Sequence, residues 1–140
     1  MARILGLDYG RRRIGVAVSD PMGLIAQPVK TLSILTWEDA VEEISALVEK
    51  FEVDRIVLGL PLTLRGEIGE MAKEVKRFGE TVSRVIDIPI LFWDERLTSV
   101  QAQRIIIDMN GKIGRKKEKI DRMASVLMLQ NYLDYQRMKE

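Results

Sequence analysis

Two apolar segments, 55–60 and 88–93, restrict the kind of sheet that this chain can build. Each is almost unbroken in its apolar character, as in strands that are buried on both faces of a parallel sheet. A helical pattern over about 67–86 lies between them, with apolar residues at helical spacing. Strand, helix and strand in this order predict a parallel β-α-β unit and therefore an α/β fold.

The N-terminal part of the chain adds three strands and a helix. Residues 3–9 and 13–19 read as two strands joined by a short turn, and 24–32 predicts a third strand. Thr36 followed by Asp39 is a helix-start signature, and the helix after it carries apolar residues on one face. An antiparallel meander therefore precedes the β-α-β unit.

The C-terminal part is predicted to be helical. Thr98 and Gln101 form a capping box for a helix that runs to about Met109. A glycine- and lysine-rich loop is expected over 111–119, and a last helix should start near Ile120 and continue almost to the C-terminus. The order βββαβαβαα predicts a mixed five-stranded sheet flanked by helices.

The composition bounds the chemistry. The 140 residues are 46% hydrophobic and 31% charged, which is typical of one globular domain over residues 1–140. No apolar run approaches a membrane span and no signal-peptide layout is present, so we expect no membrane contact and a cytoplasmic location. Cysteine and histidine are absent, which excludes disulfides, most zinc sites and Ser-His-Asp or Cys-His catalysis.

Acidic residues stand at three places where predicted strands or helices begin or end. Asp8 ends an apolar strand, Asp94 and Glu95 follow the strand over 88–93, and Asp121 opens the last helix. If the relevant strands are parallel, Asp8 and Glu95 meet at one sheet edge, but alternation lets only one of Asp94 and Glu95 face Asp8. Converging carboxylates repel unless a cation lies between them. An all-oxygen site favours Mg²⁺ or Mn²⁺, as one or two ions.

Each acid also has a purely structural interpretation. Asp8 could pair with an arginine of the turn that follows it, and Glu95 with a neighbouring arginine. Asp121 could simply face the positive end of its helix dipole. Spacing alone leaves these alternatives open.

Basic residues form two groups, one directly after Asp8 and one directly before Asp121. Both groups should flank the acidic edge, where they could hold phosphates while the acids hold metal. The alternative for each is a solvated loop. The candidate nucleic-acid-binding residues are Arg11, Arg12, Arg13, Lys112, Arg115, Lys116 and Lys117.

Four motifs resemble those of the YqgF family, also called RuvX. They are ILGLDYGRRRIGVAVSD, IVLGLPLTLRGEIG, LFWDERLTSVQA and KIDRMASVLMLQNYL, in the family's order and spacing, and together they span essentially the whole chain. The family is known as Holliday-junction resolvases or pre-16S rRNA nucleases. The resemblance implies an RNase H-like fold with an acidic metal site in which Asp8, Glu95 and Asp121 match the family's acids. The turn over 63–66 departs from the family pattern.

The resemblance implies a metal-dependent nuclease that processes the 5′ end of pre-16S rRNA. In this interpretation Asp8, Glu95 and Asp121 are both catalytic and metal-binding, and structured RNA is the partner. One alternative is a Holliday-junction resolvase acting on branched DNA, which would need a dimer to cut two strands symmetrically. A non-catalytic RNase H-like nucleic-acid-binding module is another. An actin-type ATP-binding domain is disfavoured, because nucleotide is clasped there between two such domains. The residues do not separate RNA from DNA, or a monomer from a homodimer.

Overall fold

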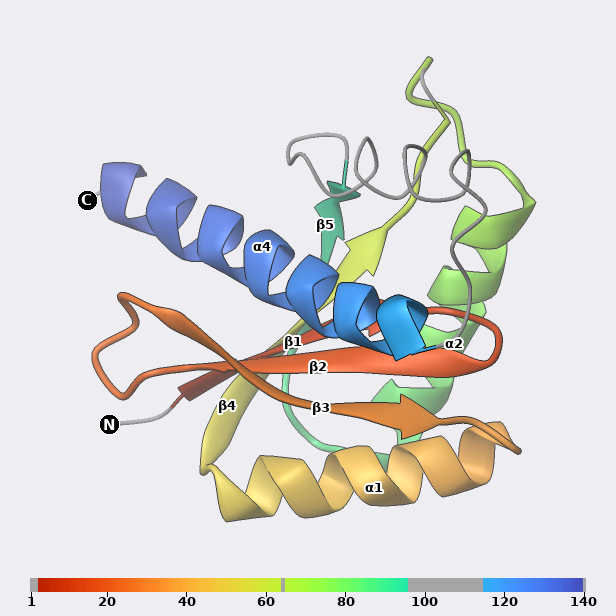
Figure 1. The fold of residues 1–140 in the computed structure, drawn as a ribbon, viewed down its shortest axis with the longest axis horizontal. Coiled ribbons are helices and arrows are strands. Elements are labelled where there is room, and N and C mark those ends of the chain that lie inside the picture. The colour runs from red at the N-terminus through yellow and green to blue at the C-terminus, as the bar shows by residue number, and fades with distance from the viewer. Residues whose placement is uncertain (1–2, 64, 96–114, 140) are drawn as a thin grey trace.

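The structure is a computed structural model that describes residues 3–63, 65–95 and 115–139, with the backbone alone for 115–122 (Figure 1). Within these residues, no helix combines the length and the apolar character that crossing a membrane requires. The described elements are β1 (Arg3–Tyr9), β2 (Arg13–Ser19), β3 (Ala26–Ser33), α1 (Trp37–Lys50), β4 (Val53–Leu60), α2 (Glu70–Val85), β5 (Ile90–Asp94) and α4 (Arg115–Lys139).

The five strands form one mixed sheet in the order β3-β2-β1-β4-β5. The β1–β2 and β2–β3 pairs are antiparallel, whereas β1–β4 and β4–β5 are parallel. The predicted meander followed by a β-α-β unit is confirmed. Helices α1 and α2 cover one face of the sheet, and α4 crosses the other (Figure 1).

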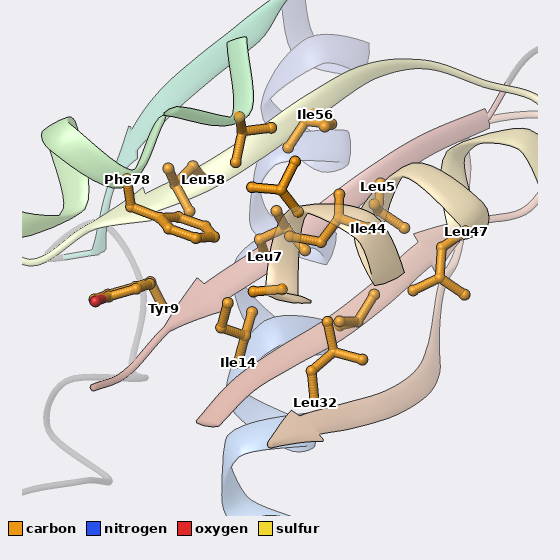
Figure 2. Packing of buried hydrophobic residues seen from close by; sticks show 14 of the residues in the cluster. Leu5, Leu7, Tyr9, Ile14, Leu32, Ile44, Leu47, Ile56, Leu58 and Phe78 are labelled. Atoms are coloured by element: carbon orange, nitrogen blue, oxygen red, sulfur yellow. The ribbon is translucent and has the colours of Figure 1, made fainter. Parts of the chain in front are cut away.

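The larger core lies between the sheet and the helices α1 and α2. Alternate residues of β1, among them Leu5 and Leu7, point into this core, where they meet Ile44 of α1 and Phe78 of α2 (Figure 2). The side chains labelled there are almost completely buried. Because side chains alternate along a strand, the residues of β1 between these core residues point to the opposite face of the sheet.

The face under α4 is lined by smaller side chains, so this helix packs close to the sheet. A methyl group at position 6 would lie 2.9 Å from Cβ of Leu129, closer than any ordinary van der Waals contact. Gly6 therefore allows α4 to approach the backbone of β1 directly. The smaller core on this face contains Ala17, Ala26, Val57, Ala124, Met128, Leu129, Tyr132 and Leu133.

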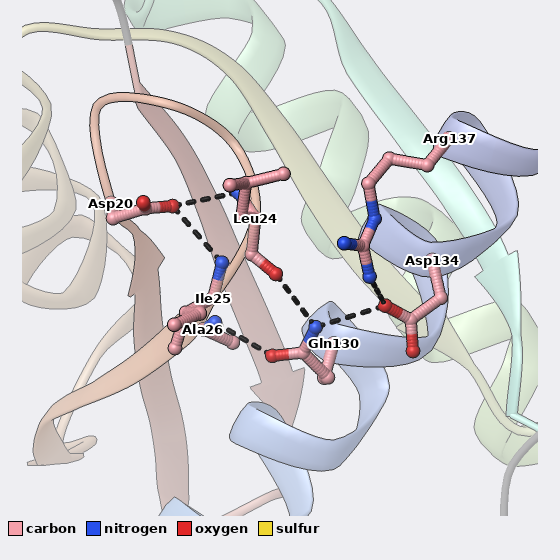
Figure 3. Close-up of polar contacts among 7 residues, drawn as sticks. All are labelled: Asp20, Leu24, Ile25, Ala26, Gln130, Asp134 and Arg137. Carbon is pink, nitrogen blue, oxygen red and sulfur yellow. Dashed lines mark hydrogen bonds and ion pairs between the residues drawn. The ribbon is translucent and has the colours of Figure 1, made fainter. Parts of the chain in front are cut away.

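A polar clamp holds α4 to the turn between β2 and β3 (Figure 3). Gln130 accepts a hydrogen bond from the Ala26 amide at 2.9 Å and donates one to the Leu24 carbonyl at 2.9 Å. The carboxylate of Asp20 closes the same turn by accepting from the amides of Leu24 and Ile25 at 2.7 and 3.0 Å. These backbone hydrogen bonds lower the pKa of Asp20.

Several predicted boundaries are confirmed and others are wrong. Thr36 caps α1 as expected, and its hydroxyl accepts from the Asp39 amide at 3.1 Å. The third strand begins at Ala26 instead of residue 24, because the preceding residues belong to the Asp20 turn. Helix α2 begins at Glu70, since Gly69 is its N-cap and ends the extended segment before it.

The last helix starts earlier than predicted, at Arg115 and not near Ile120. Residues 115–119 are all arginine, lysine or glutamate, which have good helix propensity, and no glycine or proline separates them from Ile120. The helix predicted over Thr98–Met109 and the remainder of the predicted loop, residues 111–114, lie outside the described residues.

The fifth strand is also less buried than its apolar sequence suggested. β5 is the last strand of the described sheet, and Leu91 and Phe92 are 39% and 40% exposed. A strand with only one described neighbour cannot be covered like a central strand. The apolar run indicated a strand correctly but misjudged its place in the sheet.

Candidate active site

Asp8 lies at the carboxyl end of β1, on the face covered by α4. Leu7 is paired with Leu58 of β4, and Gly6 faces Leu129 of α4, so alternation along the strand puts Asp8 on the same face as Gly6. Asp8 is only 2% exposed, and both of its carboxylate oxygens are buried. A carboxylate in this position is expensive to keep charged unless it is compensated.

Gly59 lies between Asp8 and the fifth strand. It is one step beyond Leu58 on β4, which brings it beside Asp8, and it is paired with Trp93 of β5. Trp93 faces α4, because its indole nitrogen donates to the Asn131 side chain at 2.9 Å. The residues Asp8, Gly59 and Trp93 therefore occupy neighbouring strands on one face of the sheet.

Glu95 is folded back over Gly59 beside α4. A methyl group at position 59 would lie 2.6 Å from Oε1 of Glu95 and 2.7 Å from the sulfur of Met128. Only glycine leaves room for the carboxylate here. Of Asp94 and Glu95, Glu95 is thus the one whose side chain lies on the α4 face, over Gly59. The pairing of β1 with β4 places Asp8 beside the same glycine.

The surroundings of Glu95 disfavour its charge. Its side chain is 2% exposed, and burial, together with the nearby charge of Asp94, raises the pKa of Glu95 to about 7. A cation at this point would offset both effects. A divalent ion bound here would therefore stabilise the charged form of the Glu95 carboxylate.

The third predicted acid, Asp121, lies within α4 near its N-terminal end, but its side chain is outside the described residues. Helical spacing places position 121 one turn before Ser125 and two turns before Met128, on the stripe that approaches Gly59. In the part of the chain that is described, no three acidic, cysteine or histidine side chains lie together closely enough for a metal site.

The first basic group lies in the turn after Asp8. Arg11 and Arg12 are exposed and Arg13 begins β2, half-buried. Nε of Arg11 contacts Oε1 of Glu74 at 3.2 Å. This arginine therefore forms an ion pair with α2, the helix on the sheet face opposite to α4.

The second basic group is only partly within the described structure. Arg115, Lys116 and Lys117 belong to the first turns of α4 and not to a loop, although their side chains are outside the described residues. Lys112 lies entirely outside them.

An aromatic cluster supports the same strand end from the α2 side. Tyr9 packs against Phe78 with ring centroids 4.8 Å apart, and its hydroxyl points out of the core (Figure 2). This hydroxyl donates to Oε2 of Glu74 at 2.8 Å and accepts from the Trp37 indole at 3.1 Å. Burial and the Glu74 hydrogen bond raise the pKa of Tyr9 to about 12, so it keeps its proton.

Two features of the site escaped sequence analysis. Glu74 does not stand out in the sequence, because nothing in its spacing signals a contact with Tyr9 and Arg11. Gly59 offered a signal, because a glycine within an apolar strand often marks a close approach of another group.

Comparison with known proteins identifies the relatives of this chain. A family profile described as RuvX, Holliday junction resolvase, matches residues 2–135. The chain belongs to the RuvX family. A relative from Sulfurihydrogenibium sp. is 48% identical over 136 residues, covering 96% of this chain and 91% of the relative. One from Thermoanaerobacter pseudethanolicus is 45% identical over 139 residues, covering 98% and 99%. Both carry the name "Putative pre-16S rRNA nuclease".

Solved structures place this RuvX chain in the RNase H-like fold. RuvC of T. thermophilus, in complex with a Holliday junction substrate, has a TM-score of 0.64 at 13% identity, covering 99% of this chain and 97% of that one. The fowlpox virus Holliday junction resolvase has a TM-score of 0.51 at 12% identity, covering 99% of both. At these identities the likeness establishes the fold, which confirms the predicted fold class.

Proposed function

We propose that the chain is a metal-dependent nuclease that hydrolyses phosphodiester bonds in the 5′ leader of pre-16S rRNA. The observation that carries the proposal is the placement of two buried carboxylates at Gly59, with Glu95 folded over this glycine and Asp8 beside it on the neighbouring strand. Membership of the RuvX family and the names of its relatives support the reaction and the substrate. The same proposal treats the chain as one nuclease domain acting in the cytoplasm.

The donor set fits a divalent ion. Carboxylate oxygens are the ligands that Mg²⁺ and Mn²⁺ prefer, and the raised pKa of Glu95 indicates a place where added positive charge is favourable. Asp8 and Glu95 would hold the ion, with Asp121 as a third ligand from α4. The chemistry that one or two bound ions supply is activation of water and neutralisation of charge at the phosphodiester.

The protein's own groups then position substrate and ligands. Gly59 keeps space for the Glu95 carboxylate, and the packing of α4 on Gly6 holds the helix that carries Asp121 against the sheet. The predicted basic groups, Arg11–Arg13 on the first turn and Lys112 with Arg115–Lys117 before Asp121, would bind the phosphates of the strand.

A cleavage assay tests this proposal. A pre-16S rRNA 5′ leader and a four-way DNA junction are offered side by side with Mn²⁺ to the wild type, Asp8→Asn and Asp20→Asn. We expect the wild type and Asp20→Asn, whose carboxylate is remote from the site, to cut the RNA, and folded Asp8→Asn to lose cleavage by orders of magnitude. Cleavage by Asp8→Asn would overturn the site, and cutting of the junction alone would overturn the substrate.

A further inference from the structure

Glu74 connects three elements at the edge of the candidate active site. Its Oε2 accepts from the hydroxyl of Tyr9, the residue after Asp8, at 2.8 Å. Its Oε1 pairs with Nε of Arg11 at 3.2 Å. Both carboxylate oxygens are thus used, one by the end of β1 and the other by the turn between β1 and β2.

Tyr9 is buried in the core, whereas Arg11, at the other end of this chain of contacts, is exposed to solvent. Tyr9 is 5% exposed and also receives a hydrogen bond from Trp37, so its hydroxyl is fixed. The side chain of Glu74 is 19% exposed and that of Arg11 is 67% exposed. The buried Tyr9 therefore holds the Glu74 carboxylate in place, and this carboxylate in turn holds the solvent-exposed guanidinium of Arg11.

The atom used by Glu74 matters for what Arg11 can do. The carboxylate takes Nε, while the two terminal nitrogens belong to the edge of the guanidinium that matches two oxygens of one phosphate. An exposed arginine alone would lose much side-chain freedom on binding a phosphate. The contact with Glu74 restricts that freedom before the substrate arrives.

We propose that Glu74 is a positioning residue that presents Arg11 to a phosphate of the substrate strand beside the Asp8 edge. The inference rests on the proposed function, because it takes a nucleic acid as the substrate. It goes beyond that function in one respect. The acidic residue Glu74 would strengthen the binding of a negatively charged nucleic acid, although its own charge repels it.

The sign of the effect is the test. Binding to a 5′ leader RNA is measured without divalent metal, so that cleavage plays no part, for the wild type and Glu74→Ala. Loss of a negative charge by itself should tighten the binding of RNA. If Glu74 positions Arg11, Glu74→Ala should instead weaken binding by about three- to tenfold, because one charge-assisted phosphate contact becomes disordered. The slope of log affinity against log salt should fall by about 0.7–0.9.

Glu70 offers a matched control. It lies one turn earlier on α2, is highly exposed and contacts Lys73 at 3.7 Å. Glu70→Ala removes the same charge from the same helix and should leave binding unchanged or slightly tighter. An equal weakening by both variants would overturn the inference.

A double-mutant cycle separates positioning from a structural role. If Glu74 acts through Arg11, Glu74→Ala should have almost no further effect in the Arg11→Ala background. If it only ties α2 to β1, the loss should be the same in both backgrounds, which would refute positioning. Tyr9→Phe keeps the ring packing and removes the hydroxyl, so it should weaken binding in the same direction, even if Glu74→Ala folds poorly.

The outcome for the wild type distinguishes this inference from the proposed function. A wild-type protein that binds neither the leader RNA nor other nucleic acid would overturn the proposed function itself. A wild type that binds RNA, with Glu74→Ala binding equally well or more tightly, would overturn only the role of Glu74.

Discussion

At the scale of single residues, Glu95 occupies a place that disfavours its own charge. It is buried between β4 and α4, with Asp94 adjacent in sequence, and these two causes raise its pKa to about 7. In an unfolded chain the group would have an ordinary glutamate pKa. The difference makes the stability of the metal-free protein depend on pH.

We predict that the metal-free protein loses stability as the pH rises from about 4.5 to above 7. The folded state holds the Glu95 proton over this range and the unfolded state does not, so the contribution is present at low pH and lost above the folded pKa. The loss should reach about 3 kcal/mol, since one pKa unit corresponds to about 1.4 kcal/mol. Urea unfolding in chelator at several pH values measures it, and Glu95→Gln should flatten the curve. Equal pH dependence in the two proteins would contradict the prediction.

At the scale of secondary-structure elements, two glycines set the distance between α4 and the sheet. Gly6 lies under Leu129, and Gly59 lies under Met128 and Glu95. The two positions make similar contacts with the helix, but only Gly59 also touches a proposed metal ligand. Substitutions at the two glycines can therefore distinguish an effect on helix packing from an effect on the proposed metal ligand.

Gly59→Ala should weaken Mn²⁺ binding and Gly6→Ala should not. Each added methyl overpacks the α4 interface and should cost about 1–3 kcal/mol of unfolding free energy. The methyl at position 59 also meets Oε1 of Glu95 at 2.6 Å and must displace it. Urea unfolding and Mn²⁺ titration of both variants provide the comparison. Equal Mn²⁺ affinities in the two folded variants would mean that Glu95 is not a ligand.

The clamp at Gln130 gives a second prediction for α4. Gln130→Ala removes the hydrogen bonds to the Ala26 amide and the Leu24 carbonyl (Figure 3) and should cost about 1–2 kcal/mol of unfolding free energy. The matched control is Gln136→Ala, further along the same helix. The clamp would be unimportant if urea unfolding gave the same free energy for both variants.

The elements also mark how far the sequence can predict this molecule. The cap at Thr36 and the strand over 3–9 depend on local sequence, and both are confirmed. The start of α4 was wrong because charged helix formers resemble a basic loop in composition. The exposure of β5 was misjudged because the position of a strand in a sheet depends on non-local pairing.

The candidate site divides in the same way. Asp8 and Glu95 could be predicted to meet, since the ends of parallel strands meet at one edge. The sequence did not decide which of Asp94 and Glu95 lies on the same face of the sheet as Asp8. The contact of Glu74 with Tyr9 and Arg11 could not be predicted, because it joins residues 63 and 65 positions apart in the chain through side chains alone.

At the scale of the whole molecule, the sheet brings distant parts of the chain to one edge. Asp8 lies on β1, Glu95 directly follows β5, and position 121 belongs to α4. Helix α4 crosses the face of the sheet that carries the two buried acids (Figure 1). The same sheet keeps its larger core on the opposite face, under α1 and α2. Substitutions of the proposed ligands should therefore change metal binding without unfolding the molecule.

Calorimetric titration with Mn²⁺ tests the proposed metal site most directly. The wild type should bind Mn²⁺, whereas Asp8→Asn and Glu95→Gln should each lose at least about tenfold in affinity while remaining folded, because each loses a charged ligand oxygen. Asp20→Asn, which removes a carboxylate at the remote β2–β3 turn, should bind like the wild type. Wild-type Mn²⁺ affinity in both folded Asp8→Asn and Glu95→Gln would show that these two carboxylates do not form a metal site.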